Sequence, residues 1–225
     1  THLMDAMPVD FSDELRAWSS QLKASRKMLE VIEERFLEMP QGGTAVGSGI
    51  NAHKQFAKLF AQELTKLSGS NCKYVPSSNF FHELSAQDCS VQLSGELKNL
   101  AVILMKISND LRWMNSGPLA GLSEIELQAL QPGSSIMPGK VNPVIPEAVT
   151  MASADVIGND VSITVAAQAG NFQLNVMLPV IAYNLLKSIN LLSGAMNVLA
   201  SKGIKTFKVN QKNLETSLSR NPILV

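Results

Sequence analysis

Residues 93–114 read LSGELKNLAVILMKISNDLRWM, and this stretch decides the fold class. Its apolar side chains recur at intervals of four and three residues, at Leu93, Leu97, Leu100, Leu104, Ile107, Leu111 and Met114. This spacing is typical of the seam of a long α-helix that packs lengthwise against other helices. We therefore expect one helix from about residue 82 to residue 114, ended by Asn115-Ser116-Gly117-Pro118.

The helical period also occurs in most of the remaining chain. It predicts further helices at about 15–39, 52–67, 147–169 and 174–199, and no strand-like alternation of useful length is present. Without a fixed-period repeat or a linker, residues 1–225 are expected to form one all-α domain, an elongated bundle of long helices.

The helix expected at 174–199 is apolar on most of its faces, which is typical of a helix buried on all sides. One chain of this length cannot easily cover it, so neighbouring subunits are its natural cover. The bundle is therefore expected to contribute to a multi-subunit helical core. Polar residues in this segment are expected to set the register of the seam, namely Asn175, Asn184, Asn190 and Asn197.

The composition excludes several classes of partner and cofactor. Nineteen Lys and Arg balance nineteen Asp and Glu, which argues against a nucleic-acid partner or a polybasic membrane surface. The longest purely apolar run, Leu100 to Met105, is far too short to span a bilayer. Two cysteines and three histidines cannot form an iron–sulfur cluster or a closed zinc site from this chain alone. We expect no metal and no cofactor.

The connection from residue 118 to residue 146 is unusually long for a helical protein, and such loops are usually functional or disordered. Its second half, residues 133–143, reads GSSIMPGKVNP and offers two hydroxyls, one cation and one carboxamide. Glycines at both ends allow close backbone approach, and clustered N–H groups with Lys140 predict an anion site. Pro146 and Glu147 then suit the first turn of a helix.

This loop resembles the signature G-S-S-x-M-P-x-K-x-N of the fumarase/aspartase superfamily and matches it at every fixed position. The resemblance extends over essentially the whole chain. It includes Thr1-His2 with Asp5-Ala6, the Gly-rich stretch 42–51, and residues 109–112 with 116–118.

Within the superfamily, residues 137–140 and 170–175 are most similar to class II fumarases, whereas residues 142–147 are more similar to aspartases. The resemblance to the fumarases implies reversible elimination of water from L-malate to give fumarate through an aci-carboxylate intermediate. An aspartate ammonia-lyase is the first alternative. A catalytically inactive structural or interaction module is the second.

The resemblance also implies roles for individual residues. Ser134 corresponds to the catalytic base, and His2 with Glu147 to the pair that transfers the proton of the departing water. The positions of substrate contacts are Thr1, Ser135, Lys140, Val141 and Asn142. Family members are homotetramers with shared active sites, so His2 and Glu147 are expected to meet between chains. His53 and His82 match no catalytic position.

Neither end of the sequence resembles a natural terminus. We therefore expect a central part of a longer subunit that lacks an N-terminal domain and the end of the bundle. Such a piece alone is expected to have little or no activity. The cytoplasm is the expected compartment, or the mitochondrial matrix in a eukaryote.

Overall fold

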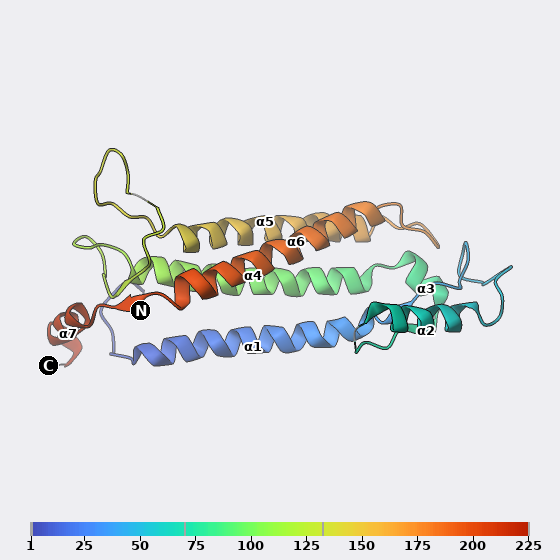
Figure 1. The fold of residues 1–225 in the computed structure, drawn as a ribbon, viewed down its shortest axis with the longest axis horizontal. Coiled ribbons are helices and arrows are strands. Elements are labelled where there is room, and N and C mark those ends of the chain that lie inside the picture. The colour runs from blue at the N-terminus through green and yellow to red at the C-terminus, as the bar shows by residue number, and fades with distance from the viewer. Residues whose placement is uncertain (1, 70, 132, 225) are drawn as a thin grey trace. The chain divides into compact units, whose positions relative to one another are not determined.

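The computed structural model describes residues 2–69, 71–131 and 133–224, and their regular elements are helices apart from four two-residue strands. The all-α prediction is therefore confirmed. The α-helices are α1 (Phe11–Arg35), α2 (Phe56–Ser68), α3 (Phe80–Ser85), α4 (Asp88–Met114), α5 (Val144–Ala167), α6 (Leu178–Val198) and α7 (Gln211–Ser219), as labelled in Figure 1. A π-helix (Leu199–Ile204) follows α6, and a short 3-10 helix (Pro222–Leu224) follows α7.

The chain divides into two compact units, and each of the four long helices, α1, α4, α5 and α6, contributes residues to both. Unit 1 comprises Thr1–Lys23, Leu100–Asp155 and Asn190–Val225, and unit 2 comprises Ala24–Asn99 and Val156–Ile189. The periodic apolar residues form the core of each unit. They include Leu104, Leu111, Val149 and Leu192 in unit 1, and Leu97, Val156, Ile163 and Ile181 in unit 2.

A polar network joins α1 to α4 in unit 1. The Lys106 Nζ and the Trp18 Nε1 each donate to Oε1 of Glu14 at 2.8 Å. The hydrogen bond from Lys106 holds the pKa of Glu14 below its ordinary value. The Lys106 ammonium also lies 5.8 Å from the centre of the Trp18 ring, a cation–π arrangement.

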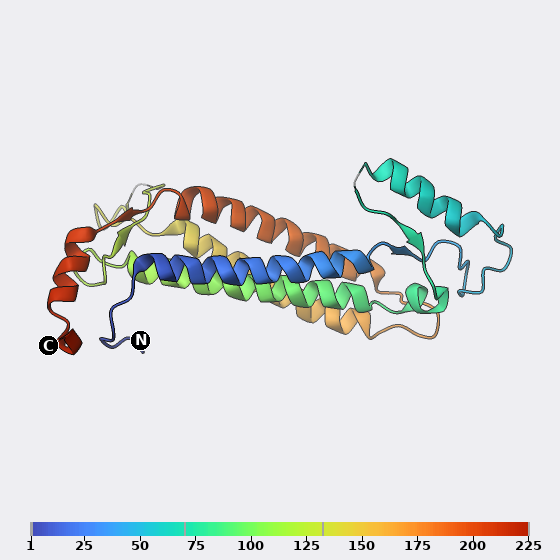
Figure 2. The same ribbon diagram turned by 90° about the horizontal axis from the view of Figure 1, so that it is seen from below.

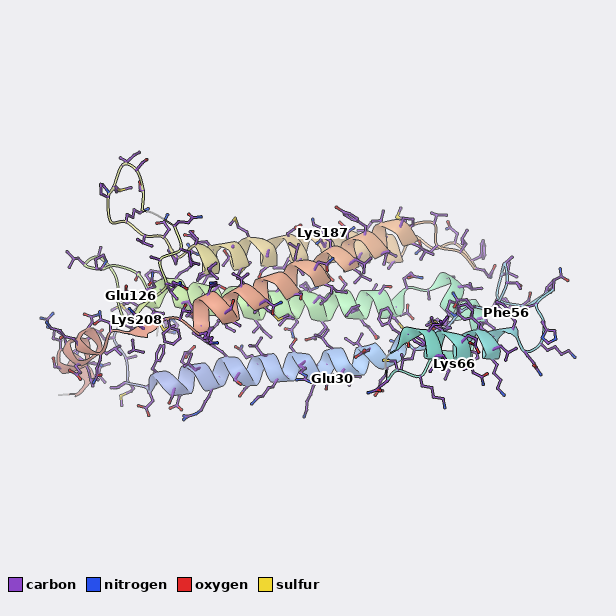
Figure 3. The ribbon with its side chains drawn as sticks, in the orientation of Figure 1. Glu30, Phe56, Lys66, Glu126, Lys187 and Lys208 are labelled. Carbon is purple, nitrogen blue, oxygen red and sulfur yellow. The ribbon has the colours of Figure 1, made fainter. Side chains whose placement is uncertain are left out.

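A two-stranded antiparallel sheet, β3 (Ile125–Glu126) with β4 (Lys208–Val209), ties the loop after α4 to the chain after α6. Glu126 and Lys208, labelled in Figure 3, lie opposite each other in this sheet. Asn210 then caps α7, because its side chain accepts from the Asn213 N–H at 3.3 Å while its own N–H donates to Glu124. This short helix lies outside the predicted set.

The two terminal segments of unit 1 lie side by side. The Asn221 carboxamide donates to the Ala6 carbonyl at 2.9 Å, and Figure 2 shows the N and C labels close together. The segment that carries His2 is thereby held beside the segment that follows α7.

In unit 2, the single helix predicted from residue 82 is wrong at its beginning. Ala86 has an extended backbone (φ −80°, ψ 146°), so the chain leaves the helix between α3 and α4. The apolar period begins only at Leu93, and it therefore supports α4 but not the residues before it. His82 spans this break, because its two ring nitrogens lie 2.9 Å from Glu83 Oε1 and 2.9 Å from Asp88 Oδ2.

The first predicted helix also ends early, at Arg35 rather than near Met39. The reason is a second small sheet, in which β1 (Glu38–Met39) pairs in parallel with β2 (Val75–Pro76). The Gly-rich stretch follows β1. A Cβ at Gly47, whose φ is +102°, would lie 2.8 Å from the backbone nitrogen of Phe81, so the turn requires glycine.

Asn175 does not set a helical seam, because α6 begins only at Leu178. Its buried carboxamide donates to the carbonyls of Ala166 and Ala167 at 3.0 and 3.2 Å. Its Oδ1 accepts from the Met177 N–H at 2.8 Å. Asn175 therefore satisfies the last carbonyls of α5 and fixes the connection to α6.

None of the helices in the described part of the chain is long and apolar enough to cross a membrane.

Candidate active site

A cavity of about 390 Å³ in unit 1 lies between the end of α4 and the beginning of α5. One of its walls comes from the end of a regular helix, and the other from the long loop that the sequence marks as unusual. One wall is formed by Asn109, Arg112, Trp113, Asn115, Ser116 and Gly117, and the other by Lys140, Val141, Asn142, Pro143 and Glu147.

Local folding explains why Glu147 faces this cavity. α5 begins at Val144, three residues before the predicted boundary, and Pro146 is fully buried in its first turn. Glu147 follows in the same turn, where the partial positive charge of the helix end favours a carboxylate. On the other wall, the Asn115 side chain accepts from the Leu127 N–H at 2.8 Å and folds the chain after α4 back on itself.

The residues before the cavity wall form a closed turn. The Ser134 N–H donates to the Lys140 carbonyl at 3.2 Å, and the Lys140 N–H donates to the Met137 carbonyl at 3.1 Å. Gly139 has a φ of +85°, which favours glycine. This turn, residues 133–140, belongs to the loop that extends beyond the helix ends before α5 in Figure 1.

The Ser134 hydroxyl has a specific environment within this turn. Its oxygen accepts hydrogen bonds from the backbone N–H groups of Ile136 and Met137, at 3.2 and 3.4 Å. Two donors directed at one oxygen favour its negatively charged form over the neutral hydroxyl. The side chain is half-buried, whereas the neighbouring Ser135 is exposed.

The structure brings four of the predicted site residues to one cavity: Lys140, Val141, Asn142 and Glu147. Ser134 and Ser135 lie on the adjoining turn and do not line the cavity. His2 is exposed, and no hydrogen bond or ion pair joins it to Glu147 within this chain. Thr1 lies outside the described residues.

Sequence reasoning assigned no role to the residues that α4 contributes. Asn109 and Arg112 are one helical turn apart, and the Arg112 Nη1 donates to Asn109 Oδ1 at 3.0 Å. The resemblance of residues 109–112 to the superfamily was the available signal. With Lys140, the cavity has two cationic side chains and one carboxylate, a balance that suits an anion.

Two other cavities lie in unit 2, and neither contains a predicted site residue. One of about 520 Å³ lies at the Gly-rich stretch beside His53, whose Nδ1 accepts from the Gln55 N–H at 3.2 Å. The other, of about 340 Å³, contains His82 and Cys89, and burial raises the pKa of the Cys89 thiol. No group of three or more His, Cys, Asp or Glu residues arranged to hold a metal ion occurs in residues 2–69, 71–131 and 133–224.

One known family matches most of this chain. A family model described as Lyase matches residues 1–158, which include the cavity and the turn. The chain therefore belongs to the lyase family.

Individual relatives have more specific names. The chain is 59% identical over 225 residues to "Fumarate hydratase class II 2" of Pseudomonas aeruginosa, and 45% identical to "Fumarate hydratase class II" of Bacillus subtilis. It covers 49% and 48% of those proteins, so it spans about half the length of the curated relatives it matches. The crystal structure of class II fumarase from Schistosoma mansoni is similar with a TM-score of 0.95 and 34% identity, over 98% of this chain and 49% of that one.

Proposed function

We propose that this chain supplies part of the active site of a fumarate hydratase, which converts L-malate reversibly into fumarate and water. The observation that carries the proposal is the cavity that joins Lys140, Asn142 and Glu147 beside the Ser134 turn. The names of the relatives, which match the chain over its full length, support the same reaction.

The proposed substrate is a small dicarboxylate. Lys140 supplies a positive charge at the cavity wall, and the carboxamide of Asn142 supplies N–H donors beside it. Ser135, Val141 and Thr1 complete the proposed substrate contacts from the same loop and from the N-terminal segment. No metal or cofactor takes part in this proposal.

Ser134 is the proposed base that removes a proton from the carbon next to a carboxylate. That carbon is a very weak acid, and a positioned base alone contributes only about 10²–10⁴-fold. The larger contribution must come from stabilising the charge that develops on the aci-carboxylate. The N–H groups of Ile136 and Met137 stabilise the Ser134 alkoxide, and closure of the loop over the substrate would strengthen every charge interaction.

The second proton transfer, to the departing hydroxyl, is proposed for a His2–Glu147 pair. A carboxylate on one imidazole nitrogen fixes the tautomer and raises the basicity of the other nitrogen. Glu147 lines the cavity and His2 is exposed elsewhere in unit 1. We propose that His2 of one subunit meets Glu147 of another.

Shared sites require an assembly, and we propose a homotetramer. On α6, Ile181 and Leu185 are buried while Tyr183 and Leu186 are 67% and 61% exposed. Large apolar side chains exposed on a long helix are unfavourable in water and favour a contact with another subunit. Leu186→Glu is therefore expected to lower the sedimentation coefficient of the full-length protein, whereas Leu67→Glu, at an 82% exposed position on α2, leaves it unchanged.

We further propose that residues 1–225 act as the central helical-bundle domain of a longer subunit that functions in the cytoplasm, or in the mitochondrial matrix of a eukaryote. The chain spans about half the length of its curated relatives, which supports this division of the subunit.

The decisive experiment compares two substrates. The full-length protein is incubated separately with L-malate and with L-aspartate, and fumarate is followed by its ultraviolet absorbance. We expect fumarate from L-malate alone. Fumarate from L-aspartate with release of ammonia would identify an ammonia-lyase, and no fumarate from either would leave a structural role.

A further inference from the structure

Arg112 is a cation on the cavity wall that the proposed mechanism does not use. It lies in the last turn of α4, where Leu111 and Met114 point into the core with 0% and 8% exposure. The helical period therefore directs Arg112 and Trp113 away from the core, and both line the cavity with Lys140 and Glu147.

The guanidinium of Arg112 keeps most of its hydrogen-bonding capacity for a ligand. Its Nη1 donates to Asn109 Oδ1 at 3.0 Å, and no carboxylate of the described residues forms an ion pair with it. Two other arginines differ, because Arg16 pairs with Asp13 and Arg26 pairs with Glu30. Since a guanidinium has five N–H donors, at least two of them remain free along one edge of the group to bind an incoming carboxylate.

We infer that Arg112 is a second carboxylate-binding residue of this cavity, which holds one carboxylate of the dicarboxylate while Lys140 holds the other. The inference rests on the proposed function and extends it to a residue that has no assigned role. Two cations on the cavity wall match the two carboxylates of a dianion one to one. The planar fork binds a carboxylate in two parallel hydrogen bonds, which a lysine cannot do.

Asn109 acts in this arrangement as a positioning residue. Its carboxamide oxygen holds Nη1 of Arg112 from one turn earlier on α4, which limits the rotamers of a long and flexible side chain. A merely structural role for Arg112, such as stabilising the carbonyl end of α4, would make no use of this tether. The two roles therefore predict different responses to mutation.

The test uses the full-length protein with Arg112→Gln, Arg112→Lys and Asn109→Ala, and Arg26→Gln as a matched control. Binding of succinate, a dicarboxylate that cannot eliminate water, is measured by titration calorimetry, and kcat and KM are measured with L-malate. We expect Arg112→Gln to weaken succinate binding and raise KM by about 10-fold or more, with a smaller change in kcat. Arg112→Lys and Asn109→Ala should have succinate affinities and KM values between those of the wild type and Arg112→Gln. Arg26→Gln should match the wild type in both quantities.

The outcomes separate this inference from the proposed function. If the wild type converts L-malate but Arg112→Gln leaves KM and succinate affinity unchanged, the inference is wrong and the proposed function stands. If the wild type binds succinate but does not convert L-malate, and Arg112→Gln weakens the binding of succinate, the inference stands and the proposed reaction fails. If Arg112→Lys lowers the melting temperature but leaves the affinity for succinate unchanged, Arg112 has a structural role alone. A wild type that binds no succinate would contradict the inference directly.

Discussion

Gly133 packs against the carbonyl oxygen of Lys140 so closely that a Cβ at this glycine would lie 2.7 Å from it. The next residue, Ser134, donates its N–H to that same carbonyl. The contact between Gly133 and Lys140 therefore fixes the proposed base and the proposed substrate-binding cation at the two ends of one turn.

Gly133→Ala is expected to lower kcat with L-malate by at least about 10-fold, because a 2.7 Å contact with backbone forces the turn to open. Steady-state kinetics of the full-length variant would measure the change. Gly95→Ala is the matched control, since its added Cβ meets nothing within 4 Å in α4. It should leave kcat unchanged and stabilise the protein by about 0.5–1 kcal/mol. Equal kinetics in the two variants would contradict the proposed role of the turn.

Ser134→Ala is expected to reduce kcat by several orders of magnitude, because it removes the oxygen that two backbone N–H groups stabilise. The affinity for succinate should change little, since the proposed role of Ser134 is to take a proton from carbon and not to hold a carboxylate. Ser20→Ala, at an exposed position on α1, is the control. Turnover of Ser134→Ala close to that of Ser20→Ala would remove Ser134 from the role of base.

Lys98→Met is expected to destabilise the protein by about 1–3 kcal/mol, because it leaves a buried carboxylate without its cation. Asp160 is 8% exposed and accepts from Lys98 at 2.6 Å and from Ser94 at 2.7 Å. Denaturant unfolding would measure the loss. Lys66→Met, which breaks an exposed pair with Glu63, should cost less than about 0.5 kcal/mol. A loss for Lys98→Met no greater than that for Lys66→Met would show that Asp160 stays hydrated.

The His82 contacts predict a pH dependence at the α3–α4 break. The hydrogen bond to Asp88, with a further contribution from Glu83, raises the pKa of His82 above its ordinary value. The stabilisation is thus complete below the ordinary pKa of histidine, about 6.5, and is lost as pH rises through the raised value. An imidazole NMR titration would measure this pKa. Asp88→Asn should lower it, and an unchanged value would contradict the contact.

The long helices could be predicted because their apolar period is uninterrupted, as from Leu93 to Met114. The break at Ala86 could not be predicted from this period. It depends on the extended backbone of Ala86 and on the side-chain contacts of Asn79 and His82. α7 is too short for its period to be distinctive, and its position depends on the cap at Asn210. Periodicity therefore predicted which segments form long helices. The ends of those helices depend on local contacts, which the apolar period does not reveal.

The site divides in the same way. The signature loop predicted Lys140, Val141 and Asn142, and the wider resemblance added Glu147; these four residues share a cavity. Arg112 was missed because its approach to that loop depends on how the chain folds back after α4, through the Asn115 contact with Leu127. The pairing of His2 with Glu147 concerns two subunits and stays a prediction.

The π-helix after α6 changes how relatives of different length should be aligned. In its bonding pattern the Lys205 N–H donates to the Ala200 carbonyl at 3.0 Å, so each hydrogen bond spans one residue more than in an α-helix. A single deletion here would therefore return the segment to α geometry, in which each residue turns the chain by about 100°. Because the longer bonds of the π-helix take up the extra residue, Lys208 and Val209 would keep nearly the same direction and their alignment with β3. A one-residue gap between relatives is therefore best placed at Leu199–Ile204, where the helix absorbs it, rather than in α6 or in β4.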